Sequence, residues 1–177
     1  RKTPHVGVEQ KLWVKALAIG SDREGAAVLI TLDNCGISEG TWREVRSRLA
    51  KSAKIRADRI VIASSHTHSA PSTKDWAPNI FVRDLTPDEQ GAIDRYTATL
   101  VINLEQVAHD ALKNRRAGTL SWSSGAAQFA ANRRTRGGPV DRALPVLKAV
   151  DTSGKLLALV ANYACHCTTL GGEFNHV

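Results

Sequence analysis

The sequence predicts an α/β protein with a mixed β-sheet and flanking helices, in the order β-β-α-β-α-β-β-β. Three observations lead to this fold class: apolar runs of strand length, two segments with helical periodicity between them, and polar turns that join neighbouring runs. Hairpins require antiparallel pairing and helical connections allow parallel pairing, so we expect a mixed sheet. With no internal repeat or linker, residues 1–177 are expected to form a single domain.

The first half of the chain carries four of these elements. Residues 12–19 and 26–32 are apolar runs joined by a polar turn, which is typical of a hairpin. Residues 38–53 have apolar side chains at helical spacing, and Ser38 is the expected N-cap. Residues 59–64 form a nearly all-apolar run, as expected for a buried strand.

The second half begins with a loop and a long helix. Residues 72–85 contain a proline and little periodicity, so we expect a loop there. Thr86-Pro87-Asp88-Glu89 has the pattern of a capping box, and it predicts a helix that runs to about Lys113. A strand, a polar Arg/Gly-rich loop and a hairpin of two strands should follow, over residues 119–129, 132–142, 144–150 and 156–163.

The chain is basic, with 24 Lys and Arg against 17 Asp and Glu and a formal net charge of +7. The basic residues are dispersed, and the stretch Arg43–Arg59 is interleaved with acidic residues, as on the solvated face of a helix. No nucleic-acid motif accompanies them, so we expect no nucleic-acid partner. No apolar run approaches the roughly 20 residues that span a bilayer. The start at Arg1, without an initiator Met, suggests a piece of a longer protein and leaves localisation open.

The three cysteines, Cys35, Cys165 and Cys167, make an odd count. Cys165 and Cys167 lie too close together on a strand for an easy mutual disulfide. We therefore expect small buried thiols, which do not fix the redox compartment.

Polar side chains follow three of the predicted strands, at the point where each strand ends. They are Asp33, the pair His66 and His68, and His166. Functional residues of α/β sheets gather beyond the carboxyl ends of strands. If the His66–His68 segment is extended, both imidazoles share a face and can converge on one ion or substrate. Neutral imidazole suits zinc, so the pattern indicates a metal site, with another active-site role or a structural role as alternatives.

Other polar positions leave more than one interpretation open. Asp33 is a metal ligand, an orienter of a ligand His, or a cap of its strand. Asn132-Arg133-Arg134 lies in the Gly-rich loop, where an arginine can bind a carbonyl, carboxylate or phosphate, or can simply be exposed. His5, His109 and His176 follow no predicted strand and are expected to have no role in the site.

The segment Val61–Pro71, with His66-Thr67-His68-Ser69-Ala70-Pro71, resembles the His-Thr-His-Ser-Gly-Pro element of the neutral/alkaline, non-lysosomal ceramidases. Ala70 stands where the family usually has Gly. Further segments resemble the family in the same order, and they are Leu12–Ile19, Leu32–Gly36, Asn132-Arg133, Val146–Asp151 and Asn162–Thr169. The likeness covers nearly the whole chain.

The resemblance implies the N-terminal part of the catalytic domain of a zinc amidase that cleaves the N-acyl bond of a ceramide-like lipid. It makes His66 and His166 zinc ligands, and it makes His68 a catalytic residue beside the metal that contacts the substrate or a catalytic hydroxyl. It assigns Asn132 and Arg133 to substrate binding, with Arg133 also catalytic. The family's active-site Ser and its Glu and Tyr ligands match nothing in these residues. This part of the domain alone is therefore expected to bind metal weakly and turn over poorly.

The resemblance also suggests a secreted or periplasmic protein, a lipid or other N-acyl small molecule as its partner, and contact with a membrane surface. Two alternatives are kept. The first is a metal-dependent phosphoesterase that uses Asp33 with the three histidines of the strand ends. The second is a non-catalytic relative.

Overall fold

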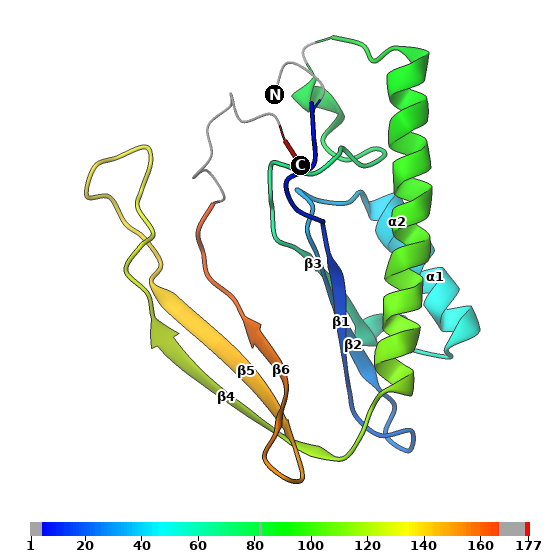
Figure 1. Ribbon diagram of the computed structural model, residues 1–177, viewed down its shortest axis with the longest axis vertical. Helices are drawn as coiled ribbons and strands as arrows, with labels where there is room; N and C mark the ends of the chain where they lie inside the picture. The colour runs from blue at the N-terminus through cyan, green and yellow to red at the C-terminus, as the bar shows by residue number, and fades with distance from the viewer. Residues whose placement is uncertain (1–4, 82, 167–175) are drawn as a thin grey trace. The chain divides into compact units, whose positions relative to one another are not determined.

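The computed structural model describes residues 5–81, 83–166 and 176–177 (Figure 1). The described residues divide into two compact units. The first unit takes the residues up to Arg115 together with His176 and Val177, and the second unit spans Arg116–His166. The single domain expected over residues 1–177 stays a prediction.

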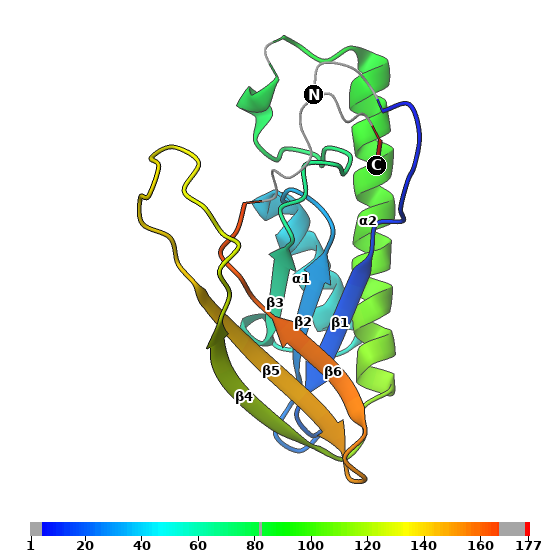
Figure 2. The ribbon, with the colours of Figure 1, turned by 60° about the vertical axis from the view of Figure 1, so that its left-hand side comes forward.

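The first unit contains a three-stranded sheet and two long helices (Figure 2). The sheet has the order β1-β2-β3, with β1 antiparallel to β2 and β2 parallel to β3. The two helices lie on one face of this sheet (Figure 1). The elements are β1 (Val14–Ile19), β2 (Ala27–Leu32), α1 (Glu39–Ser52), η1 (Ala57–Arg59), β3 (Ile60–Ser64), η2 (Pro78–Ile80) and α2 (Pro87–Lys113).

The core of the first unit lies between the sheet and the helices. Alternate residues of β2 are buried, because successive side chains of a strand point to opposite faces of the sheet. They pack against Val45 and Leu49 of α1 and against Leu100 and Leu104 of α2. The residues that α1 and α2 bury recur at helical spacing, so each helix turns one face toward the sheet.

Both helices begin where the sequence predicted. Ser38 caps α1, because its Oγ accepts a hydrogen bond from the Thr41 N–H at 3.2 Å. Thr86 and Glu89 form the capping box of α2, with Glu89 N–H donating to Thr86 Oγ1 at 3.3 Å and Thr86 N–H donating to Glu89 Oε2 at 2.9 Å. In the part of the chain that the structure describes, no helix has the length and apolar character needed to cross a membrane.

The basic stretch on α1 is a solvated helix face, as predicted. Arg43 pairs with Glu39 at 2.7 Å and Arg48 pairs with Glu44 at 2.8 Å, each four residues apart. Such exposed pairs contribute only about 0.3–0.5 kcal/mol each. Two of the arginines of this helix are therefore paired locally with glutamates.

The second unit is an antiparallel sheet of order β4-β5-β6, formed by β4 (Gly118–Ala126), β5 (Ala143–Asp151) and β6 (Leu156–Ala161). Asp151 shapes the β5–β6 hairpin, because its Oδ1 accepts hydrogen bonds from the Ser153 and Lys155 N–H groups. The Ser153 hydroxyl also donates to this oxygen, at 2.6 Å, and this bond is the largest cause of the lowered pKa of Asp151, followed by the Lys155 N–H bond.

The predicted fold class and element order are confirmed. The mixed sheet consists of the first three strands, and the last three pair among themselves in a separate sheet. Strands that follow one another along the chain usually pair with each other, and β4, β5 and β6 do so here. Hydrophobic pattern alone does not say which strands share a sheet.

The buried face of α2 provides a test of the core. Leu104→Ala should lower the free energy of unfolding by about 2–5 kcal/mol, since it leaves a cavity in a well-packed interior. Ile102→Ala is the matched control on the same helix, because Leu104 is 0% exposed and Ile102 is 58% exposed. Urea unfolding should separate the two variants clearly. Equal destabilisation would mean that α2 does not pack as described.

The capping box makes stability depend on pH. The Arg83 guanidinium and the Thr86 N–H hold the pKa of Glu89 at about 2, below its ordinary value of 4.5. A lowered folded-state pKa contributes stability that is present above about pH 4.5 and is lost as the pH falls toward 2. Glu89→Gln keeps an acceptor at the cap but cannot titrate. The melting temperature of this variant should therefore fall less than that of the wild type between about pH 5 and pH 2. An unchanged slope in Glu89→Gln would contradict this contribution of Glu89.

Candidate metal centre

The candidate site of the first unit lies where β2 and β3 end. The two strands are parallel neighbours, with Leu32 opposite Ser64. Pairing continues past the strand ends, because Ser65 N–H donates to Leu32 O at 2.9 Å and His66 N–H donates to Asn34 O at 3.0 Å. The two loops that the sequence placed at strand ends are therefore held side by side, as predicted.

His66 has a fixed ring orientation. Its Nδ1 lies 2.7 Å from the backbone carbonyl oxygen of Cys35. A carbonyl can only accept, so Nδ1 carries the proton and Nε2 bears the lone pair. Metal-binding histidines are commonly oriented in this way, by a hydrogen bond from the nitrogen that does not bind the metal.

The backbone of His66 is left-handed, with φ of 60°. This conformation costs a non-glycine residue about 1–3 kcal/mol and is concentrated at functional sites. The His66–His68 segment is thus not extended, and the shared strand face is not what brings the imidazoles together. The turn at His66 does so, since the two ring centroids are 5.1 Å apart in an edge contact.

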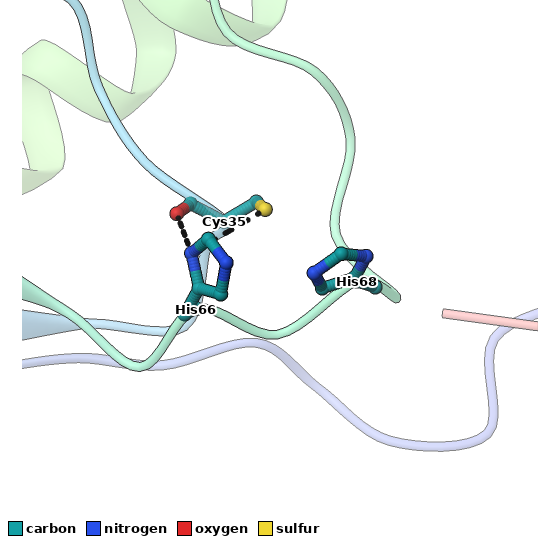
Figure 3. A group of neighbouring side chains, drawn as sticks. All are labelled: Cys35, His66 and His68. Carbon is teal, nitrogen blue, oxygen red and sulfur yellow. Dashed lines mark hydrogen bonds between the residues drawn. The ribbon is translucent and has the colours of Figure 1, made fainter. Parts of the chain in front are cut away.

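Cys35 joins the two histidines (Figure 3). Its Sγ lies 3.7 Å from His66 Nδ1. One potential ligand atom from each of Cys35, His66 and His68 lies within 4.8 Å of the others. Both histidines are exposed and Cys35 is half-buried. Among the described residues this is the one such group of three His, Cys, Asp or Glu side chains.

Asn34 connects the parts of the site, a role that no sequence pattern predicted. Its side chain is 1% exposed. Its Nδ2 donates to Pro71 O at 3.1 Å and to Tyr96 Oη at 3.4 Å, and its Oδ1 accepts from Gly36 N–H at 3.1 Å. One buried amide thus fastens the cysteine loop to the histidine loop and to α2. Burial raises the pKa of Tyr96, and the Asn34 hydrogen bond opposes that shift.

Trp76 forms a wall beside His66, with 6.5 Å between their ring centroids. Its indole packs directly against Gly36, where any Cβ would collide with it. Thr73 Oγ1 donates to Gly36 O at 2.8 Å and holds the loop of Trp76 in place. Trp76 also borders a cavity of about 440 Å³ in the first unit, lined by apolar and charged side chains. That volume is typical of small-molecule sites.

Asp33 caps its strand, which was one of its three interpretations. Its Oδ2 accepts from Trp13 N–H at 3.0 Å, and its own N–H donates to Trp13 O at 2.9 Å. These bonds close the end of the β1–β2 ladder. Asp33 does not belong to the cysteine–histidine group.

In the second unit, His166 lies beyond β6 and meets Arg133. Arg133 Nη1 is 3.3 Å from His166 Nδ1. A guanidinium can only donate, so His166 Nδ1 is the acceptor. Asn132 organises the same loop, because its Oδ1 accepts from the Arg134 and Thr135 N–H groups at 3.0 and 2.9 Å. The substrate-binding roles of Asn132 and Arg133 stay predictions.

His66 and His166 belong to different units. Their shared metal therefore stays a prediction. His109 links the helices, because its Nε2 lies 2.8 Å from Ser52 Oγ.

The expectation of buried thiols is wrong where it can be checked. Cys35 is half-buried and Cys165 is exposed. Both lie in segments beyond strand ends rather than on a strand face that packs against a core. Cys167 and the end of the Asn162–Thr169 segment lie outside the described residues.

Comparisons with known proteins found similar solved structures but no matching family model or curated sequence. No protein-family model matches the sequence. No curated protein matches it significantly. Two solved structures are similar over almost the whole chain. The neutral ceramidase of Pseudomonas aeruginosa has a TM-score of 0.74 and 21% identity over 97% of this chain. A structure described as ceramidase complexed with C2 has a TM-score of 0.71 and 22% identity over 94% of this chain.

The chain spans only part of these neighbours, 29% of the first and 27% of the second. At this identity the likeness concerns the fold alone. The resemblance found in the sequence and the similarity in three dimensions point to the same family of structures. This chain therefore has the fold of a part of neutral ceramidase.

Proposed function

We propose that this chain supplies part of the active site of a zinc-dependent hydrolase of the neutral ceramidase type. The reaction would be cleavage of the N-acyl amide bond of a ceramide-like lipid by activated water. The observation that carries the proposal is His66, whose Nε2 lone pair is oriented by the Cys35 carbonyl at the strand ends of a ceramidase-like fold. The substrate comes from the resemblance and from what the neighbours are called.

The side chains present fit zinc. Imidazole nitrogen and cysteine sulfur are the usual zinc ligands of proteins, and both occur within the group of Cys35, His66 and His68. Hard ions such as magnesium prefer oxygen donors, and no carboxylate of the described residues belongs to the group. The chemistry that bound zinc supplies is activation of water and polarisation of a carbonyl oxygen.

His66 and His166 are the proposed zinc ligands. His66 already has the tautomer that binding through Nε2 requires. His166 does not, because Arg133 donates to its Nδ1 and the neutral ring then carries its proton on Nε2. Neither nitrogen of His166 can bind a cation until Arg133 moves away. The guanidinium that is released can donate to the carbonyl oxygen of the substrate, where negative charge develops in amide hydrolysis.

His68 is the proposed contact on the substrate side. Its exposed ring stands at the edge of His66 and can donate or accept a hydrogen bond toward a bound molecule. The cavity that Trp76 borders offers space for a part of that molecule within the first unit. Lipid substrates, contact with a membrane surface and a secreted or periplasmic location remain part of the proposal, and the net charge of +7 suits an anionic surface.

The phosphoesterase alternative receives less support. It requires Asp33 beside the histidines, yet the Asp33 carboxylate is engaged at the end of β1 and β2. The two reactions are separated by assaying the purified full-length protein on an N-acyl-sphingosine and on an aryl phosphate, with metal content measured in parallel. One zinc and amide cleavage support the proposal, whereas two metals with phosphatase activity would overturn it.

The ligand assignment predicts a specific pattern of metal loss. His66→Ala and His166→Ala should each abolish stoichiometric zinc binding in the full-length protein, since each removes one protein ligand. His109→Ala should retain zinc, because His109 contacts Ser52 between the helices. Zinc content by elemental analysis, with circular dichroism as the folding control, decides the matter. Equal zinc in all three variants would refute the assignment.

A second prediction follows from the contact between Arg133 and His166. Arg133→Ala should bind zinc at least as tightly as the wild type, because a competing donor and a positive charge are removed from His166. Amide cleavage should nevertheless fall by about 10²–10³-fold, the usual effect of losing an oxyanion donor. Arg134→Ala is the neighbouring control and should leave both quantities unchanged. Loss of zinc in Arg133→Ala would contradict the proposed competition.

A further inference from the structure

We propose that Asn34 is a positioning residue for the reaction, because its side chain fixes the loop that carries His68 beside His66. The inference rests on the proposed function for the roles of the two histidines. It goes beyond that function by naming the residue that sets their relative position. Asn34 contacts neither the metal nor the substrate in this proposal, so the proposed zinc ligands stay as they are.

Asn34 holds both ends of the segment from His66 to Pro71. At the first end, its backbone carbonyl oxygen accepts from His66 N–H at 3.0 Å. At the other end, its side-chain Nδ2 donates to the Pro71 carbonyl oxygen at 3.1 Å. His68 lies between these two attachment points, and its ring centroid is 5.1 Å from that of His66. A single residue beyond β2 therefore fixes where the histidine segment starts and where it ends.

The Asn34 side chain is itself held in one orientation. Its Oδ1 accepts from Gly36 N–H at 3.1 Å, and its Nδ2 also donates to Tyr96 Oη of α2 at 3.4 Å. The carboxamide is buried, and both its donor and its acceptor atoms have partners. An unpaired polar group in such a place costs about 1–3 kcal/mol, so the bond to Pro71 is maintained in the folded protein.

The side chain of Asn34 acts on His68 rather than on His66. His66 is positioned by its N–H, which donates to the Asn34 backbone, and by its Nδ1, which donates to the Cys35 carbonyl. A substitution of the Asn34 side chain leaves both backbone acceptors in place. The bond to Pro71, in contrast, closes the segment on the far side of His68. Loss of this bond should therefore preserve zinc binding and displace His68, and a misplacement of about 1 Å can slow a reaction by about 10²-fold.

The test uses two substitutions in the full-length protein. Asn34→Ser keeps a hydroxyl that can accept from Gly36 N–H, since serine forms the same kind of turn as asparagine. The serine side chain is one atom shorter, so it gives up the bond to Pro71. Asn34→Ala removes both bonds. Each variant should keep its zinc and lose about 10–100-fold in kcat/KM on an N-acyl-sphingosine.

Leu104→Ala is the control for lost stability, because Leu104 lies in the core and not in the loops of the site. At a temperature at which circular dichroism shows every variant to be folded, Leu104→Ala should keep the wild-type kcat/KM. An equal fall in kcat/KM in Leu104→Ala would mean that the loss in the Asn34 variants reflects stability, and it would overturn the positioning role.

A double-mutant cycle with His68 separates positioning from a purely structural role. If Asn34 acts through His68, introducing Asn34→Ser into His68→Ala should change kcat/KM by less than about twofold. A structural role instead makes the two losses multiply. Losses that multiply in the double variant would therefore overturn the inference.

Hydrogen exchange supplies a readout that does not depend on activity. The Ser69 N–H donates to Thr67 Oγ1 within the histidine segment. Peptides that cover this segment should exchange faster in Asn34→Ser than in the wild type, as measured by mass spectrometry. Tyr96→Phe leaves the bond to Pro71 intact and should keep the wild-type exchange rate. Unchanged exchange in Asn34→Ser would show that Asn34 does not hold the segment.

The outcomes separate this inference from the proposed function. Wild-type rates of amide cleavage in both Asn34 variants overturn the positioning role and leave the proposed function standing. A wild-type protein that cleaves no N-acyl-sphingosine overturns the proposed function and the positioning role with it. The exchange measurement then still decides whether Asn34 holds the segment that carries His68.

Discussion

The parallel pairing of β2 with β3 brings the residues of the candidate metal centre to one edge of the sheet. Parallel strands end at the same edge of a sheet, so the segments that leave them start side by side and must satisfy each other's backbone groups. Here Leu32 O and Asn34 O accept from Ser65 and His66. Asn34 then completes the connection, because a carboxamide can donate and accept at once and so bridges loops that a hydrophobic side chain could only pack against.

This arrangement explains how a left-handed histidine is tolerated. The strain at His66 costs about 1–3 kcal/mol. The backbone bond to Asn34 and the ring bond to Cys35 offset it, at about 0.5–1.5 kcal/mol each. The result is an imidazole whose orientation is set before any ligand arrives. The second unit differs, because the ring of His166 is occupied by Arg133, so its proposed ligand role would require a rearrangement that the proposed role of His66 does not need.

Local sequence patterns predicted the local features of this structure. The caps at Ser38 and Thr86 and the histidines beyond β3 follow from spacing within a few residues. Asn34 and Cys35 could not be assigned that way, because their contacts lie 31 to 62 positions along the chain. Nor does periodicity reveal the turn at His66, where the tertiary bonds to the neighbouring loop override the extended preference of a strand continuation.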